Sequence, residues 1–90
     1  MRLIKFTSAF KKDYKRVFKR GHSKEKLEHL LNLLVADEVL PASTRPHKLT
    51  GNYSNCWECH IEPDWVLIYQ LVDDDLLVLR RTGSHADLFK

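Results

Sequence analysis

The sequence lacks any long apolar run and is poor in cysteine, proline and glycine. Its 90 residues include two Cys, three Pro and three Gly, with no internal repeat and no low-complexity tract. No stretch approaches the roughly 18 consecutive apolar residues of a membrane span. The segment from Met1 to Lys5 also lacks the apolar run of a signal peptide. We therefore expect a cytoplasmic protein that does not contact membranes.

The two cysteines form a Cys-x-x-Cys at Cys56 and Cys59. A zinc site would need two further ligands, and a redox pair of the thioredoxin kind would need to begin a helix. If the segment is a strand, a spacing of three directs the two thiols to opposite faces. We expect two ordinary reduced cysteines and no metal ion or cofactor, with a metal site as the alternative.

The chain has enough hydrophobic residues for one core, and its charges are distributed asymmetrically along the sequence. Hydrophobic residues make up 43% and charged residues 30%, which predicts a single domain over residues 1–90. Residues 1–24 hold nine Lys or Arg against one acid, Asp13, whereas residues 25–90 hold six Lys or Arg against eleven Asp or Glu. The basic part is the natural contact for a polyanion or an acidic protein, or else a solvated helix face.

The first third of the chain predicts a strand followed by two helices. Residues 2–6 are compatible with a strand, and a helix follows with Ser8 as its N-cap and Gly21 as its stop. One face of this helix is apolar, and its other face is a continuous basic stripe of Lys11, Lys12, Lys15, Arg16, Lys19 and Arg20. Ser23 caps a second amphipathic helix that ends near Asp37, so we expect an antiparallel helical hairpin.

The rest of the chain predicts a long loop and three strands. Residues 41–55 are rich in loop-forming residues, and loops of this length are often functional. The strands cover residues 56–61, 65–72 and 76–82, with the second one central because it is apolar on both faces. The order β-α-α-β-β-β predicts an α+β fold, with the helical hairpin packed on one face of a mainly antiparallel sheet.

Five polar residues are candidates for chemistry: His47, His60, Asp64, Arg81 and His85. In an antiparallel sheet the last four converge at one edge, and His47 joins them if the long loop folds over. Metal-independent RNA cleavage needs a base for the ribose 2′-OH, an acid for the departing 5′-oxygen and a cation for the phosphorus centre. Histidine and arginine supply these groups. Taken singly, each has a structural explanation, such as a turn former for Asp64 or a carboxylate partner for Arg81.

Aromatic and basic residues near these five are candidate substrate contacts. Tyr53 and Phe89 lie outside the regular strands and are better placed to stack on bases than Trp65 and Tyr69, which we assign to the core. The set of expected substrate contacts is Tyr53, Phe89 and Lys48. Arg80 faces away from its neighbour and is expected to contact solvent or a partner.

Three segments resemble the YafQ branch of the RelE/ParE toxin superfamily. They are His47-Lys-Leu-Thr-Gly-Asn-Tyr53, Cys59-His-Ile-Glu-Pro-Asp-Trp-Val-Leu-Ile-Tyr69 and Arg81-Thr-Gly-Ser-His-Ala-Asp-Leu-Phe89. The resemblance extends over essentially the whole chain and implies a RelE-like fold. It also implies a toxin that inhibits translation as a ribosome-dependent mRNA endoribonuclease, leaving a 2′,3′-cyclic phosphate and a 5′-hydroxyl. Cys56 and Cys59 are not part of the family's motif, which raises the question of redox sensitivity.

The resemblance also implies site residues and partners. The family's catalytic residues map onto His47, His60, Asp64, Arg81 and His85, and its C-terminal aromatic maps onto Phe89. The implied partners are the 70S ribosome with its mRNA and a cognate antitoxin, usually a ribbon-helix-helix DNA-binding protein. Operator DNA is contacted only through the antitoxin complex. The basic stripe would dock on ribosomal RNA through phosphate contacts.

Two other functions fit parts of the sequence. A ParE-like toxin on the same fold would inhibit DNA gyrase and would have no use for an acid-base cluster. A regulatory RNA-binding module would use only the basic stripe, and growth arrest on expression without antitoxin would argue against it.

Overall fold

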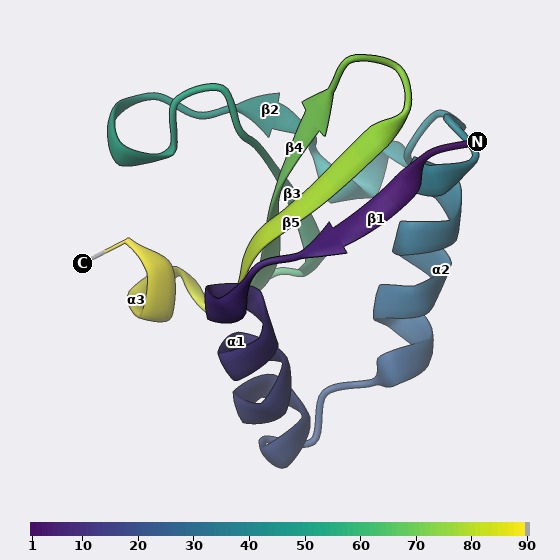
Figure 1. The fold of residues 1–90 in the computed structure, drawn as a ribbon. Coiled ribbons are helices and arrows are strands. Elements are labelled where there is room, and N and C mark those ends of the chain that lie inside the picture. Colours follow the sequence, from purple (N-terminus) through teal and green to yellow (C-terminus); the bar gives the residue numbers. More distant parts are fainter. Residues whose placement is uncertain (90) are drawn as a thin grey trace.

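The computed structural model describes residues 1–89 and places two long helices on one face of a five-stranded sheet (Figure 1). The strands are β1 (Leu3–Phe6), β2 (His47–Lys48), β3 (Trp57–Glu62), β4 (Trp65–Val72) and β5 (Leu76–Gly83). The helices are α1 (Ser8–Lys19), α2 (Lys24–Val35) and the short α3 (His85–Leu88), with single 3-10 turns η1 (Ala42–Thr44) and η2 (Gly51–Tyr53). The predicted α+β fold is confirmed.

The sheet has the order β1-β5-β4-β3-β2, so the apolar strand β4 is central as predicted. β2, β3, β4 and β5 pair antiparallel, and β1 joins the edge parallel to β5. β1 pairs only with residues 76–79 of β5. The end of β5 therefore projects beyond β1, and this free end carries the residues that reach the site.

Both faces of β4 are covered, by different parts of the chain. Trp65, Leu67 and Tyr69 pack in the main core with the helices, whereas Val66 and Ile68 pack in a second, smaller core with residues of the long loop and the C-terminal tail. The apolar character of both faces of β4, read from the sequence, is thus explained by two separate covers. Since the loop is anchored by apolar packing, its position over the sheet is fixed on the side opposite the helices.

The two thiols lie on opposite faces of the sheet, as their spacing predicts. Cys59 is in the main core and Cys56 in the second one, and both are buried and unpaired. Burial, reinforced by the neighbouring Glu58 carboxylate, raises the pKa of the Cys59 thiol to about 12. A buried thiol with so little thiolate is a poor nucleophile and a poor target for oxidation.

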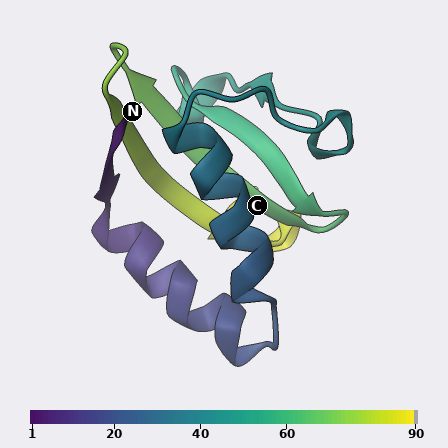
Figure 2. The same cartoon turned by 90° about the vertical axis from the view of Figure 1, so that its right-hand side faces the viewer.

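The helices are joined as a hairpin but diverge instead of packing along their length (Figure 2). α1 lies against β5 and α2 against β3, with β4 between these two strands. An apolar groove remains between the helices, lined by Phe10, Tyr14, Leu27 and Leu31 and flanked by lysines. No helix within residues 1–89 is long and apolar enough to cross a membrane.

Local signals for the helix ends are correct to within two residues. Thr7, not Ser8, caps α1, because its Oγ1 accepts from the Phe10 N–H at 3.1 Å while its hydroxyl donates to the Leu79 carbonyl. The hydroxyl thus serves the helix end and the sheet together. Gly21 has a φ of +93°, a conformation open to glycine, and stops the helix as predicted.

Residues 41–55 are more ordered than the loop expected from their composition. His47 and Lys48 form β2 against Glu58 and Trp57, which adds a strand that the sequence did not reveal. The backbone N–H of Leu49 donates to the Cys56 carbonyl at 2.9 Å and extends this pairing. The loop therefore folds back as an edge of the sheet, and its place is set by pairing with β3.

Thr82→Val is expected to destabilise the protein by about 1–3 kcal/mol. The Trp65 indole N–H donates to Thr82 Oγ1 at 2.9 Å, and the Thr82 hydroxyl donates to the Val66 carbonyl at 2.8 Å, all in fully buried positions. Valine has the same shape but leaves the indole N–H without an acceptor. Urea unfolding would measure the loss, with Thr50→Val on the exposed loop as the control. Equal stabilities of the two variants would contradict this account.

Candidate active site

A row of side chains crosses the sheet on the face away from the helices. The register pairs His47 of β2 with Glu58 of β3, Glu58 with Ile68 of β4, and Ile68 with Arg81 of β5. A β-bulge in β5 falls between the partners of Ile68 and Tyr69, so the register shifts by one residue there. That extra residue is Arg80, and the shift aligns Arg81 with the row.

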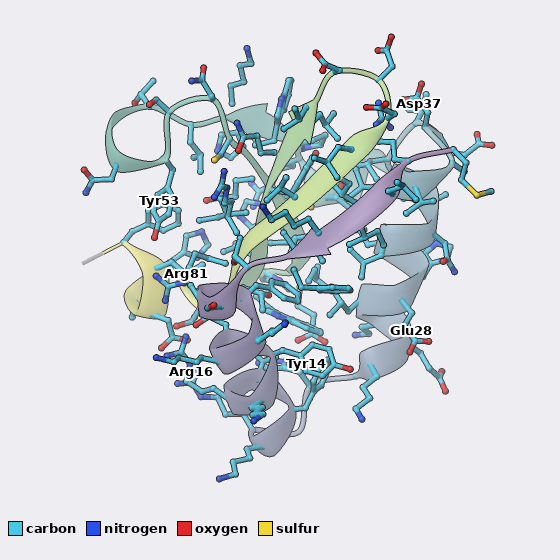
Figure 3. All side chains as sticks on the ribbon, in the orientation of Figure 1. Tyr14, Arg16, Glu28, Asp37, Tyr53 and Arg81 are labelled. Carbon is cyan, nitrogen blue, oxygen red and sulfur yellow. The ribbon has the colours of Figure 1, made fainter. Side chains whose placement is uncertain are left out.

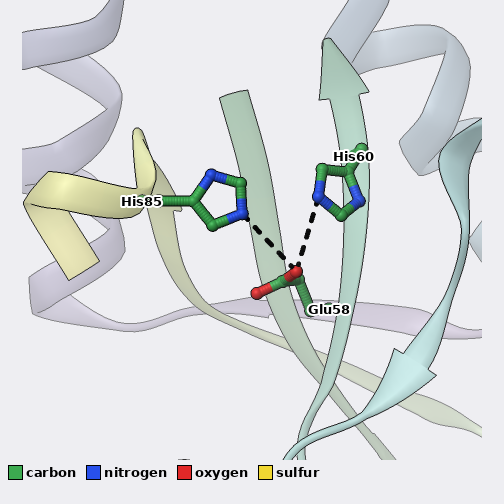
Figure 4. A group of neighbouring side chains, drawn as sticks. All are labelled: Glu58, His60 and His85. Carbon is green, nitrogen blue, oxygen red and sulfur yellow. Dashed lines mark ion pairs between the residues drawn. The ribbon is translucent and has the colours of Figure 1, made fainter. Parts of the chain in front are cut away.

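Three histidines surround one buried carboxylate in this row. Glu58 Oε1 lies 3.6 Å from His47 Nε2, 3.6 Å from His60 Nε2 and 3.9 Å from His85 Nε2. The ring centroids of His60 and His85 are 5.3 Å apart, and those of His47 and His60 are 6.4 Å apart. Figure 4 shows His60 and His85 directed at Glu58 from β3 and α3. The expected convergence of the histidines thus includes His47.

Backbone carbonyls orient two of these rings. His47 Nδ1 lies 3.0 Å from the Arg45 carbonyl, and His60 Nδ1 lies 3.4 Å from the Thr44 carbonyl. A carbonyl oxygen only accepts, so each Nδ1 carries the hydrogen. The Nε2 atoms are the free nitrogens, and both face Glu58. Residue 45, the C-cap of η1, is in the left-handed region with φ +44°, and the consecutive carbonyls of residues 44 and 45 face the two rings.

Asp64 orients the third ring. Its Oδ1 accepts from the His85 backbone N–H at 3.0 Å and lies 2.8 Å from His85 Nδ1. These two contacts, the backbone one first, lower the pKa of Asp64 below its ordinary value. Asp64 therefore stays ionised and holds His85 with its Nε2 towards Glu58.

Arg81 reaches the site but is already paired. Its Nε and Nη2 donate to the buried Asp13 carboxylate at 2.6 and 3.2 Å, and its Nη1 donates to the Tyr53 hydroxyl at 3.5 Å. The hydrogen bond to Asp13 is the main reason that the pKa of Arg81 is raised further. The pairing leaves Nη1, beside Tyr53, as the donor nitrogen available to an incoming anion. Figure 3 shows Arg81 and Tyr53 together near α3.

Two aromatic rings continue the site from the histidines to Arg81. Phe89 lies 6.0 Å from the His85 ring and 5.7 Å from the Tyr53 ring, centroid to centroid, and is 40% exposed. The Tyr53 hydroxyl also donates to the Leu88 carbonyl at 3.4 Å. The expected stacking residues therefore form one wall between the histidine cluster and the arginine.

The structure does not bring Lys48 to this site. Its Nζ lies 6.0 Å from the centre of the Trp57 ring, a residue that packs against the main core. Neighbouring residues of a strand point to opposite faces, so His47 on one face places Lys48 on the other. The expected substrate contact at Lys48 is therefore not supported by its position.

The basic face of α1 is not one continuous solvated stripe. Arg16 pairs with Asp13 at 2.6 Å and Arg20 with Asp87 at 2.6 Å, so both arginines are turned towards the end of β5 and α3. The hydrogen bond to Asp87 raises the pKa of Arg20. The exposed lysines of the expected docking face are Lys11, Lys12, Lys15 and Lys19.

Comparison with known proteins identifies this arrangement. The family described as "Bacterial toxin of type II toxin-antitoxin system, YafQ" matches residues 2–90. This chain belongs to the YafQ toxin family. The mRNA interferase toxin YafQ of Escherichia coli strain K12 is 42% identical over 87 residues, which are 96% of this chain and 94% of that protein. The resemblance read from the three sequence segments is confirmed.

Solved structures of the YafQ family share the whole fold. The crystal structure of YafQ from E. coli strain BL21(DE3) matches with a TM-score of 0.92 at 40% identity and covers 100% of both chains. The crystal structure of the E. coli DinJ-YafQ complex matches with a TM-score of 0.91 at 41% identity, again over 100% of both chains.

Two residues of this YafQ site escaped the sequence reasoning. Glu58 carried a signal, because it stands two residues before His60 in a predicted strand and must share its face. Asp13 carried a weaker one, as the single acid among the basic residues of the first 24. A single acid among so many basic residues is a candidate for the buried partner of an arginine.

Proposed function

We propose that this chain is the toxin of a type II toxin-antitoxin pair and that it inhibits translation by cleaving mRNA on the ribosome. The 2′-hydroxyl of the ribose would attack the adjacent phosphorus, and the products would be a 2′,3′-cyclic phosphate and a 5′-hydroxyl. The E. coli relative is named as an mRNA interferase toxin, and this similarity supports the proposal. Its place of action would be the cytoplasm, where ribosomes and mRNA meet.

The observation that carries the proposal is the histidine cluster beside an arginine. Proton transfer to and from RNA needs imidazoles that reach the surface, and the side chains of His47 and His85 are 51% and 45% exposed. That of His60 is 10% exposed and lies between them. We assign the transfers at the 2′-hydroxyl and the 5′-oxygen to His47 and His85, with His60 positioning them through the shared carboxylate.

Arg81 would stabilise the negative charge that accumulates at phosphorus. Two of its nitrogens are held by Asp13, so the guanidinium has a fixed orientation before RNA arrives. A preorganised donor loses little on meeting the transition state. Tyr53 and Phe89 would hold a base beside the reacting phosphate, at roughly 1–3 kcal/mol for each stacked base. A gyrase-directed activity of the ParE kind uses no such cluster and gains no support.

The partner of the free toxin would be a cognate antitoxin. The DinJ-YafQ complex of E. coli supports a partner of that kind, because its toxin chain shares this fold over its full length. We propose that this antitoxin is of the ribbon-helix-helix type and that the complex, not the toxin alone, binds operator DNA. The ribosome and its mRNA would be the remaining partners.

The exposed lysines of α1 would dock the toxin on ribosomal RNA. The double variant Lys12→Gln/Lys19→Gln is expected to weaken cleavage of translated message and to lower the slope of log activity against log salt by about 2. The control Lys5→Gln/Lys24→Gln removes equal charge outside α1 and should change neither. The cleavage rate and its salt dependence are measured for both double variants in a purified translation system. Equal effects of the two double variants would contradict the proposal that the α1 lysines dock on ribosomal RNA.

The class of activity is tested by translating a defined message with and without the protein. The cut is mapped by primer extension, and the new 3′ end is analysed for a cyclic phosphate. A cut inside a codon that appears only during translation, with a 2′,3′-cyclic end, supports the proposal. Intact message while the protein stops its translation would refute it.

A further inference from the structure

The bulge in β5 brings two consecutive arginines to the same face of the sheet. In a regular strand Arg80 and Arg81 would point to opposite faces. Arg81 is paired with Ile68, which packs in the second core on the face away from the helices. Arg80 Nε and Nη2 donate to Gln70 Oε1 at 3.2 and 2.5 Å, and Gln70 shares that face because it follows Tyr69 of the main core. Both guanidinium groups therefore lie on the face that carries the histidine cluster.

The two arginines line a cavity that continues the candidate active site. The cavity has a volume of about 380 Å³ and is lined by residues of β4, β5, η2 and the start of α1. Tyr53 and Arg81 belong both to this lining and to the row of site residues, so the cavity begins where that row ends. Pockets that hold small ligands measure about 300–1,000 Å³. The cavity thus has the size of a pocket for one nucleotide.

The cavity carries a positive charge that no acidic group of the described residues neutralises. Asp13 compensates Arg81, whereas the acceptor that holds Arg80 is an uncharged amide oxygen. Within residues 1–89 no acidic side chain lines the cavity and no carboxylate pairs with Arg80. The arginines that do pair with an aspartate are Arg2, Arg16, Arg20 and Arg81. An anion is therefore the ligand that this cavity attracts.

The side chain of Gln70 holds Arg80 without reducing its charge. A guanidinium only donates, so the amide oxygen of Gln70 must face it. The bonds to Gln70 occupy one side of the guanidinium, from Nε to Nη2, and the N–H groups at its end, from Nη1 and Nη2, point elsewhere. Two parallel N–H groups of this kind match the oxygens of a phosphate. Arg80 is thus oriented for a phosphate before the phosphate arrives.

We propose that the cavity binds the mRNA nucleotide next to the cleavage position, with Arg80 on its phosphate. Two arginines at consecutive positions of β5 would then bind two consecutive phosphates of one RNA strand, with Arg81 on the scissile one. This assignment rests on the nuclease function proposed above. Arg80 would bind substrate without transferring a proton, so its loss should raise KM and leave kcat nearly unchanged. Gln70 would be a positioning residue that acts through Arg80.

The phosphate contact is tested on ribosomes programmed with a synthetic message. In two further messages, the phosphate on the 5′ or on the 3′ side of the cleavage position is replaced by an uncharged methylphosphonate. We expect Arg80→Gln to raise KM about tenfold on the unmodified message, as for one lost charge-assisted hydrogen bond. On the message that lacks the phosphate bound by Arg80, the variant and wild type should have the same KM.

A matched control separates this contact from a general loss of charge. Lys24→Gln removes one exposed positive charge from the start of α2, on the other face of the sheet, and should cleave as wild type does. Equal effects of Lys24→Gln and Arg80→Gln would overturn the proposal. A tenfold effect of Arg80→Gln that persists on both modified messages would also overturn it, because Arg80 would then bind ribosomal RNA or another part of the message.

Gln70→Glu tests whether the charge of Arg80 serves the substrate. This variant keeps Arg80 and an oxygen acceptor for its hydrogen bonds, but it adds a carboxylate that neutralises the cavity. We expect KM to rise as in Arg80→Gln. If Arg80 only ties β4 to β5, Gln70→Glu should cleave as wild type does, and that result would overturn the proposal. Arg80 is exposed and Gln70 half-buried, so both variants should fold, which thermal unfolding would check.

Binding without cleavage separates this site from the nuclease function. A trinucleotide with 2′-O-methyl groups cannot attack its own phosphates, and NMR titration of the full chain measures its affinity. We expect Arg80→Gln to bind it about tenfold more weakly than wild type and Lys24→Gln do. If wild type fails to cleave programmed message, the nuclease function fails and the titration alone decides the site. Equal binding by wild type and Arg80→Gln, or no binding by either, would then overturn it.

Discussion

His85→Ala is expected to lower RNA cleavage by about 100-fold or more, within the 10²–10⁴ range of general acid-base catalysis. Its imidazole is half exposed, is oriented by Asp64 and lies beside Phe89, so it is the histidine best placed to exchange a proton with RNA. The initial rate on a translated message, at saturating ribosome concentration, measures the effect. Asp64→Asn should give a smaller loss, because it weakens the orientation of the ring without removing it.

The fold should survive this change. The ion pair between His85 and Asp64 is solvent-exposed, and such pairs contribute about 0–1 kcal/mol. Thermal unfolding of His85→Ala should therefore match that of His29→Ala, the exposed histidine on α2. Cleavage by His85→Ala at the wild-type rate would remove His85 from the catalytic residues. A large fall in thermal stability would show that the variant loses activity because it unfolds, not because it lacks the imidazole.

Asp13→Ala is expected to have the largest effect on stability, a loss of about 2–4 kcal/mol. Asp13 is 2% exposed and accepts hydrogen bonds from Arg81, Arg16 and the backbone N–H of Thr82. Alanine leaves the partly buried guanidinium of Arg81 without its anion. For a domain of this size the unfolding midpoint should fall by roughly 10–25 °C.

A second aspartate supplies the matched control. Asp37 is 81% exposed, and its partner Arg2, at 3.1 Å, also donates to the Leu34 carbonyl at 2.8 Å. Asp37→Ala therefore removes a hydrated carboxylate and should cost less than about 1 kcal/mol. Calorimetric unfolding of both variants at one pH compares a buried carboxylate with an exposed one. If the two midpoints agree within 3 °C, roughly the shift that a difference below 1 kcal/mol produces, the buried network around Asp13 contributes no more than the exposed Asp37 carboxylate.

The same variant also connects the fold to the site. Because Asp13 holds Nε and Nη2 of Arg81, its loss should misplace the guanidinium and lower cleavage even below the unfolding temperature. Asp13→Asn, which keeps the size and part of the hydrogen bonding, should recover stability more than activity. Arg81→Lys would test whether the paired hydrogen bonds from the planar guanidinium to Asp13 are needed, since lysine carries the charge without these donors.

Much of the site could be predicted from the sequence because its signals are local. The period of two in residues 56–62 and 65–72 places alternate side chains on one face, and turns at residues 63–64 and 73–75 return the strands to a common edge. The convergence of His60, Asp64, Arg81 and His85 follows from strand directions alone. The helix ends were also predictable, to within two residues, because caps depend on short-range hydrogen bonds.

Other features depend on contacts between distant residues. Arg81 lies 68 positions from Asp13, and no pattern within either segment shows that they pair. Glu58 stands in a strand beside His60, yet its role comes from three rings delivered by β2, β3 and α3. The bulge at Arg80 decides the register of Arg81, and a register shift of one residue reverses the face of every side chain beyond it.

The sequence by itself determined the two long helices, the four longer strands, the central place of residues 65–72 and the kinds of residue available for acid-base chemistry, because hydrophobic periodicity and residue chemistry are local properties. Only the tertiary structure decided which charges neutralise one another. It paired Arg16 with Asp13 and Arg20 with Asp87, placed Lys48 on the far face, and enclosed Glu58 among three imidazoles. The physical reason is desolvation: a charge removed from water must find a partner, and that partner is chosen by proximity in space, not in sequence.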